Sequence, residues 1–133
     1  MPAAQPPDNP VVVAVFNTND DVVELLRLWL ENAGFVVVSA HVDAIKRGEV
    51  DVEQFITQHK PKVAVYDVPP PYERQWAFFT HLRRNLLSDT TFVITTTNAA
   101  HLRELVGTSE RIYEIVGKPY DLDEILAAVK RAL

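Results

Sequence analysis

The sequence contains no cysteine. This absence excludes a disulfide framework, a thiolate metal site, a cysteine nucleophile and a thiol-based redox switch. Glycine is scarce too, with four in 133 residues. None of the four forms a phosphate-binding loop after the first apolar segment, where dinucleotide-binding folds place one. The available chemistry is therefore that of oxygen and nitrogen side chains.

Long apolar runs and an excess of positive charge are also missing. No run approaches the ~20 residues that a membrane-spanning helix needs, and the N-terminus lacks the basic and apolar regions of a signal peptide. Asp and Glu outnumber Lys and Arg by 18 to 13, which gives a formal net charge of −5. Because phosphate backbones attract clustered Lys and Arg, this balance argues against direct nucleic-acid binding. We expect one soluble, cytoplasmic domain without a membrane or nucleic-acid partner.

Short apolar segments alternate with amphipathic ones along most of the chain. Residues 1–10 carry four of the nine prolines and predict a disordered tail, whereas residues 11–133 predict one folded domain. We expect strands at 11–16, 35–40, 63–68, 91–97 and 111–116. A helical pattern follows each of them, and 41–50 predicts a loop with one helical turn. This order is typical of the α/β class, with a five-stranded parallel sheet and helices on both faces.

The helical segments also predict which side chains enter the core. Helical spacing places these residues of the first helix inward: Val22, Leu25, Leu26, Trp29, Leu30 and Ala33. For the last helix the same spacing selects Leu122, Ile125, Leu126, Val129 and Leu133. Trp76 and Phe79 lie at helical spacing as well, which favours a core position but leaves a docking patch open. Tyr72, beside three prolines, predicts an exposed residue at a partner surface.

Polar side chains cluster where the predicted strands end. The carboxyl ends of parallel strands meet at one edge of the sheet, which is where such folds bind ligands. The third strand ends at Asp67, the fourth at the run Thr95–Thr97, and Lys118 follows the fifth. A carboxylate can accept a phosphoryl group, while an ammonium and a hydroxyl can donate to phosphate oxygens. The structural alternatives stay open: Asp67 as a loop cap, Thr96 as an ordinary strand residue, and Lys118-Pro119 as a turn.

These strand ends, together with two helical segments, resemble the receiver domain of bacterial two-component response regulators. The strand-end features are Asp67, Thr96 and the triplet Lys118-Pro119-Tyr120. The helical segments are VVELLRLWLENAGF and KPYDLDEILAAVKRAL. The resemblance covers residues 11–133 and implies a flavodoxin-like (βα)5 receiver fold. By this likeness Asp67 is the phosphoacceptor, Thr96 reports phosphorylation, Lys118 pairs with Asp67 or its phosphate, and Pro119 follows a cis peptide bond.

The sequence departs from the receiver pattern at the metal site. Receiver domains carry two adjacent acidic residues at the end of the first strand, and these hold Mg²⁺. Here those places hold the neutral Asn17 and Thr18. Asp20 and Asp21 follow closely, but both fall where the next helix begins, and a capping role explains them as well. Because Mg²⁺ prefers carboxylate ligands, the resemblance implies an atypical receiver with a weakened Mg²⁺ site at Asp67.

Three functions remain open, and none of them is enzymatic. The first is a stand-alone response-regulator receiver in a phosphorelay, which takes phosphate on Asp67 from a histidine kinase. The second is a phosphorylation-independent pseudo-receiver that acts as a protein–protein interaction module. The third is a flavodoxin-like binder of a small ligand. The implied partners are a histidine kinase or another signalling protein, and a homodimer through a surface near Leu102, Tyr113 and Ile115.

Overall fold

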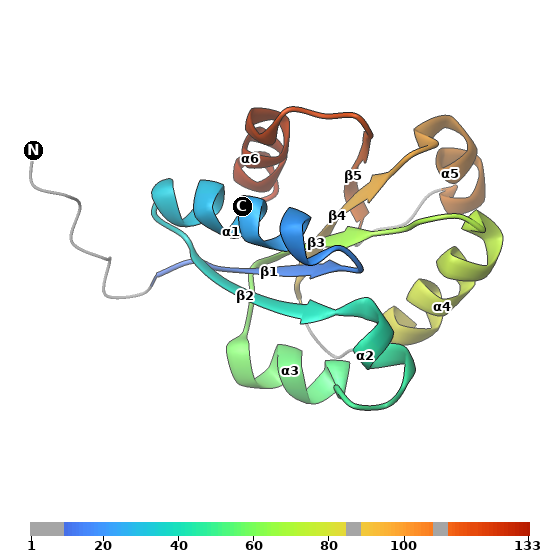
Figure 1. Ribbon diagram of the computed structural model, residues 1–133, viewed down its shortest axis with the longest axis horizontal. Helices are drawn as coiled ribbons and strands as arrows, with labels where there is room; N and C mark the ends of the chain where they lie inside the picture. The colour runs from blue at the N-terminus through green and yellow to red at the C-terminus, as the bar shows by residue number, and fades with distance from the viewer. Residues whose placement is uncertain (1–9, 85–88, 108–111) are drawn as a thin grey trace, which may run out of the picture.

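A parallel sheet of five strands forms the centre of the molecule (Figure 1). The computed structural model describes residues 10–84, 89–107 and 112–133. The strands are β1 (Val12–Asn17), β2 (Val36–His41), β3 (Val63–Asp67), β4 (Thr91–Thr96) and β5 (Ile112–Gly117), in the order β2-β1-β3-β4-β5. The predicted α/β fold with five parallel strands is therefore confirmed. The predicted disordered tail lies outside the described residues except for Pro10.

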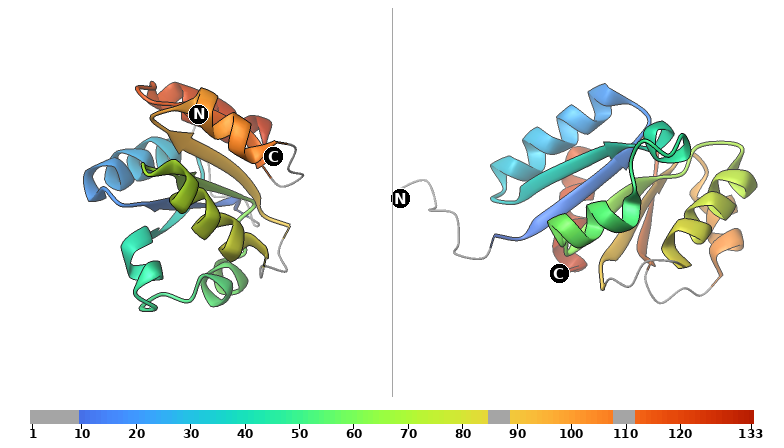
Figure 2. Two further views of the ribbon diagram at one scale, coloured as in Figure 1. Left: turned by 90° about the vertical axis from the view of Figure 1, so that its right-hand side faces the viewer. Right: turned by 90° about the horizontal axis from the view of Figure 1, so that it is seen from below.

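Helices cover both faces of the sheet (Figure 2). They are α1 (Asp20–Asn32), α2 (Val42–Lys46), α3 (Val52–His59), α4 (Tyr72–Arg84), α5 (Ala99–Val106) and α6 (Leu122–Arg131). Helices α1 and α6 pack on one face, and α2 to α5 pack on the other. The helical turn expected within 41–50 is α2. In the described ranges, no helix has both the length and the apolar character that crossing a membrane requires.

Alternation along the strands divides the core into two layers. On β3, Val63 and Val65 face α1 and α6, whereas Ala64 and Tyr66 face the other helices. Successive strand side chains point to opposite faces, so a strand buried on both faces needs apolar residues throughout. Asp67 ends this strand on the same side as Val65. The alternation thus fixes the face on which the polar end of β3 lies.

Helix α1 buries a narrower stripe than its sequence predicts. Leu26 and Leu30 are almost fully buried, but Leu25 and Trp29 are exposed. The prediction that Leu25, Trp29 and Ala33 belong to the core is therefore wrong. The row through Leu26 and Leu30 meets the sheet, while the adjacent row passes to the side facing solvent. Trp29 donates its indole N–H to Asp123 of α6 at 3.1 Å.

Helix α6 follows its predicted stripe except at the end. Ile125 and Val129 are buried as expected, together with Ala128. Leu133 is 57% exposed, so its predicted core position is wrong. The helix ends at Arg131, and residues beyond it no longer continue the row that faces the sheet.

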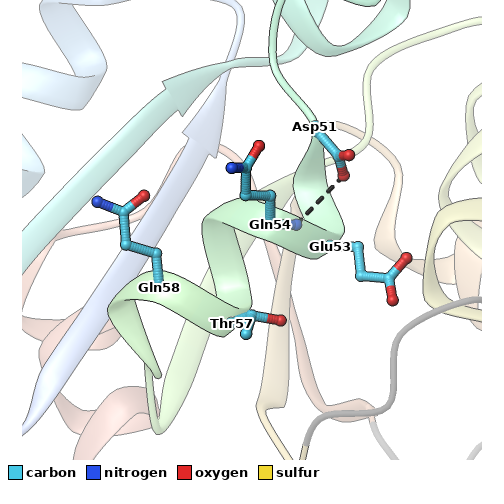
Figure 3. Close-up of a pocket in the computed structure, with 5 residues that line it drawn as sticks. All are labelled: Asp51, Glu53, Gln54, Thr57 and Gln58. Carbon is cyan, nitrogen blue, oxygen red and sulfur yellow. Dashed lines mark hydrogen bonds between the residues drawn. The ribbon is translucent and has the colours of Figure 1, made fainter.

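Helix α3 begins at a side-chain cap that predicts a measurable stability effect. Asp51 accepts a hydrogen bond from the backbone N–H of Gln54 at 3.2 Å (Figure 3). Replacing Asp51 with alanine is expected to lower the free energy of unfolding by about 1 kcal/mol, because the first turn of α3 loses its acceptor. Urea denaturation measures this loss. Asp51→Asn retains an acceptor and serves as the control; a loss equal to that of Asp51→Ala would contradict the capping role.

Candidate functional site

The carboxylate of Asp67 contacts an ammonium and a hydroxyl at the carboxyl end of β3. The Asp67 side chain is 3% exposed, and its Oδ1 atom lies 2.7 Å from Nζ of Lys118. The hydroxyl of Thr95 donates to the same oxygen, also at 2.7 Å. We call Asp67, Thr95 and Lys118 the Asp67 site. An ammonium and a hydroxyl converge here on one buried carboxylate oxygen, which offsets the cost of burying its charge.

The ends of three neighbouring strands build this site. Asp67 pairs in register with Thr95 of β4. The backbone N–H of Lys118 donates to the carbonyl of Thr96 at 2.7 Å, which fastens the segment after β5 to the end of β4. The Lys118–Pro119 peptide is cis, as the receiver resemblance implies, and the Pro70–Pro71 peptide is cis as well. The structure thus brings together Asp67 and Lys118, which the sequence placed at one sheet edge.

Thr96 makes no hydrogen bond to Asp67 in this structure. Its hydroxyl donates instead to the backbone carbonyl of Val68 at 2.9 Å. Thr95 makes the contact with Asp67, and the sequence reasoning did not select it. A signal for it was present, since residues in register on parallel strands place their side chains on the same face. Counting alternation from the valines of β3 and β4 places Asp67 and Thr95 together.

Asn17 and Thr18 form the turn that leads into α1. The Oδ1 atom of Asn17 accepts hydrogen bonds from the backbone N–H groups of Thr18 at 2.7 Å and Asn19 at 3.0 Å. Asn19 then caps α1, and its side chain accepts from Asp21 and Val22. Asp20 and Asp21 occupy the first turn of that helix and are exposed. Of the two sequence interpretations, these contacts favour turn and cap formation over metal ligation.

The donor set does not fit a firmly held Mg²⁺. Among residues 10–84, 89–107 and 112–133, no group of three or more His, Asp or Glu side chains is placed to hold a metal ion. Oδ1 of Asp67 is already engaged by Lys118 and Thr95, and Oδ1 of Asn17 is engaged by backbone N–H groups. Mg²⁺ requires near-octahedral oxygen ligation, usually with one or two carboxylates. The ammonium of Lys118 supplies the positive charge beside Asp67 instead.

Two contacts join the starts of α4 and α5 next to this edge. Tyr72 and Thr97 share a hydrogen bond between their hydroxyls, and Nε2 of His101 lies 2.6 Å from Oε1 of Glu73. The backbone N–H of Glu73 and the side chain of His101 lower the pKa of the Glu73 carboxyl. Tyr72 is half-buried, so its predicted exposure is wrong. Its hydroxyl forms a hydrogen bond with the neighbouring hydroxyl of Thr97 in the same chain.

Other predicted positions fall away from the Asp67 site or inside the core. Trp76, Phe79 and Leu102 are buried, so Leu102 is not part of a dimer surface. Ile115 is half-buried, and the side chain of Tyr113 is not among those that the structure describes. A surface hollow along α3 is lined by Asp51, Glu53, Gln54, Thr57 and Gln58 (Figure 3). No residue of the Asp67 site lines it.

No family model matches the sequence, and no curated protein is significantly similar to it. Its structure is similar to that of a response regulator from Thermotoga maritima, with 18% identity, a TM-score of 0.70, and 93% of this chain and 98% of that chain covered. The chain is also similar to the chemotaxis protein CheY4 of Vibrio cholerae, with 18% identity, a TM-score of 0.68, and 94% of this chain and 100% of that chain covered. A third similar structure is that of response regulator TrrA of T. maritima in complex with Mg²⁺–BeF. It has 19% identity and a TM-score of 0.63, with 92% of this chain and 99% of that chain covered. The chain therefore has the fold of response-regulator receiver domains.

Proposed function

We propose that this chain is a receiver domain that accepts a phosphoryl group on Asp67 from a histidine kinase. The observation that carries the proposal is the ion pair at the sheet edge, in which Lys118 lies 2.7 Å from the buried carboxylate of Asp67. The receiver fold supports it, because an acidic group at the carboxyl end of β3 lies where folds of this type bind ligands. A histidine kinase is the donor, and a cytoplasmic location belongs to the same proposal.

The transfer uses the carboxylate as a nucleophile. An oxygen of Asp67 forms a bond to phosphorus while the bond from phosphorus to the nitrogen of the phosphohistidine breaks, and the electron pair of that bond leaves with the imidazole. An acyl phosphate on Asp67 results. The ammonium of Lys118 then faces the phosphoryl oxygens, and the hydroxyl of Thr95, which already donates to Asp67, lies on the same face and can donate to one of them.

We assign no step of this transfer to a metal ion. Asp67 is the one carboxylate that remains of the acidic set implied by the receiver resemblance, and Asn17 and Thr18 stand in the other places. Any Mg²⁺ binding at Asp67 is therefore expected to be weak. Lys118 carries the charge stabilisation in this proposal, as a cation fixed to the protein.

Phosphorylation of the purified chain tests the proposal. The protein is incubated with phosphoramidate or acetyl phosphate, with and without Mg²⁺, and its intact mass is measured. We expect an adduct of one phosphoryl group on the wild type and none on Asp67→Asn, because asparagine lacks the nucleophilic carboxylate. An adduct that persists on Asp67→Asn would refute the assignment of the acceptor.

A second candidate function is a phosphorylation-independent pseudo-receiver that binds signalling proteins. One observation favours it: Oδ1 of Asn17 is fully engaged in the turn before α1, so the place of an acidic ligand is closed to a metal. The same experiment separates the two functions. If no phosphodonor modifies the wild type at any Mg²⁺ concentration, the pseudo-receiver replaces the phosphoacceptor as the proposed function.

A further inference from the structure

Strand β2 forms one edge of the sheet (Figure 1). On its inner side it pairs with β1, and the backbone N–H of Val36 donates to the carbonyl of Val11 at 3.0 Å. In a parallel strand, the backbone groups of successive residues point alternately to the two sides. Because Val36 bonds to β1, the N–H and C=O groups of Val37 and Ser39 point to the outer side. A row of outward backbone groups is a template on which another strand can pair.

Arg27 of α1 covers this outer side of β2. Its guanidinium donates from Nη1 to the carbonyl of Val37 at 2.9 Å, and from Nη2 to the hydroxyl of Ser39 at 2.8 Å. Glu24 and Glu31 lie on either side of it along α1, at 3.8 and 3.7 Å, and favour this position of the cation. The planar fork of an arginine bonds two groups of the strand at once. Arg27 therefore occupies the middle of the edge at which a further strand would bind.

The opposite edge strand, β5, has a similar contact but carries charge. Arg103 of α5 donates to the carbonyl of Ile115 at 3.3 Å, so an arginine from a neighbouring helix contacts each edge of the sheet. Glu114 lies within β5, and like charges at facing positions of two such strands oppose their pairing. The sequence of β2, VVVSAH, contains no Asp, Glu, Lys or Arg. Of the two edges, β2 is therefore the one that can pair with its own copy.

We propose that β2 is a pairing surface for β2 of a second copy of this chain, and that Arg27 prevents this pairing. The partner that matches β2 is an uncharged and apolar strand, since β2 has no charged residue and Val36 is 41% exposed. A second β2 meets both conditions, and the two strands pair antiparallel about a two-fold axis. Both β2 edges are then used, so association stops at two copies. The inference does not depend on phosphorylation of Asp67.

Two variants of Arg27 and one matched control test the closing contact. Arg27→Met removes both donors and retains an unbranched apolar side chain. Arg27→Lys keeps the charge but replaces the fork with a single ammonium, which cannot reproduce both contacts in the same geometry. Arg47→Met is the control, because Arg47 is exposed and pairs with Glu49 at 2.8 Å. It changes the net charge as Arg27→Met does, but it leaves β2 untouched.

A proline on β2 tests whether association uses this edge. Ser39→Pro is added to Arg27→Met, because proline lacks the outward N–H that a partner strand would bond. The bonds between β2 and β1 do not use the N–H of Ser39, and edge strands tolerate proline at such positions. Ser39→Pro alone shows by circular dichroism that the fold is kept.

Light scattering coupled to size-exclusion chromatography measures the mass of each variant across a range of protein concentrations. We expect Arg27→Met to reach twice the wild-type mass, with a dissociation constant about a hundredfold lower than that of the wild type. Each of the two copies no longer has to break a charge-assisted hydrogen bond, and each such bond accounts for about tenfold. Arg27→Lys is expected to shift the constant by about tenfold. Arg47→Met and the double variant with Ser39→Pro are expected to keep the wild-type mass.

Three results overturn the inference. The first is a wild-type mass in both Arg27 variants; if Arg27→Met is unfolded, Arg27→Lys decides alone, since its charge still faces Glu24 and Glu31. The second is a doubled mass that persists with Ser39→Pro, or growth beyond two copies, because the contact then lies elsewhere. The third is an Arg27→Met variant that keeps the wild-type mass but binds an uncharged extended peptide, which would replace the second copy as the occupant.

Discussion

Replacing Leu26 with alanine is expected to lower the free energy of unfolding by about 3 kcal/mol, within the range for a leucine deleted from a packed core. The same replacement of Leu25 is expected to cost less than about 0.5 kcal/mol, as at other exposed positions. The two residues are neighbours on α1, yet Leu26 is 1% exposed and Leu25 is 53% exposed. Leu26 belongs to the same buried cluster as valines of β1 and β2, so its loss leaves a cavity that the rigid sheet cannot close.

Urea denaturation followed by circular dichroism measures both effects. Leucine and alanine differ little in helix propensity, so the comparison isolates burial from the intrinsic stability of the helix. Leu30→Ala and Leu28→Ala repeat the test one turn further along, with Leu30 buried and Leu28 exposed. Equal losses at Leu25 and Leu26 would contradict the orientation of α1. A change in the slope of the denaturation curve would instead point to an altered unfolded state.

Helix α1 shows which features of a helix an apolar periodicity in the sequence can predict. The apolar spacing predicts the helix and its approximate limits because a stripe of this kind has to be buried against something. It does not select between two adjacent rows, one through Leu25 and Trp29 and one through Leu26 and Leu30. That choice depends on the rotation of the helix on the sheet, which is fixed by contacts with strands distant in sequence. The strands themselves were easier to predict, since burial on both faces leaves short apolar runs.

The candidate site also has features that the sequence predicts and others that depend on contacts in the folded structure. The rule that parallel strands end at one edge brings Asp67 and Lys118 together before any coordinates are known. The rule does not resolve which of two adjacent threonines faces the carboxylate, because that depends on the pairing of Asp67 with Thr95. It also leaves Asn17 ambiguous, since an amide can bind a metal or accept from the backbone. Only the turn geometry before α1 shows that its oxygen serves the backbone.

Replacing Lys118 with methionine is expected to destabilise the fold by about 2–3 kcal/mol, below the ~3–5 kcal/mol typical of a fully buried pair that loses one partner. The cost arises because Asp67 stays 3% exposed while its cation is gone. The reverse replacement, Asp67→Asn, is expected to cost less than about 1 kcal/mol, because it removes the buried charge and leaves only the more exposed cation of Lys118 without its partner. Asparagine keeps an oxygen for the hydroxyl of Thr95, and Lys118, already 27% exposed, can turn to water.

The double variant, Lys118→Met with Asp67→Asn, tests why the two single replacements differ in their expected cost to stability. If the loss in Lys118→Met comes from an unpaired buried carboxylate, adding Asp67→Asn removes the cause, and the double variant is more stable than Lys118→Met alone. Urea denaturation of the three variants and the wild type completes the cycle. Additive losses would mean that the ion pair with Asp67 does not account for the cost of losing Lys118. In that case Asp67 would be held mainly by Thr95, and the charge of Lys118 would remain available to a phosphoryl group.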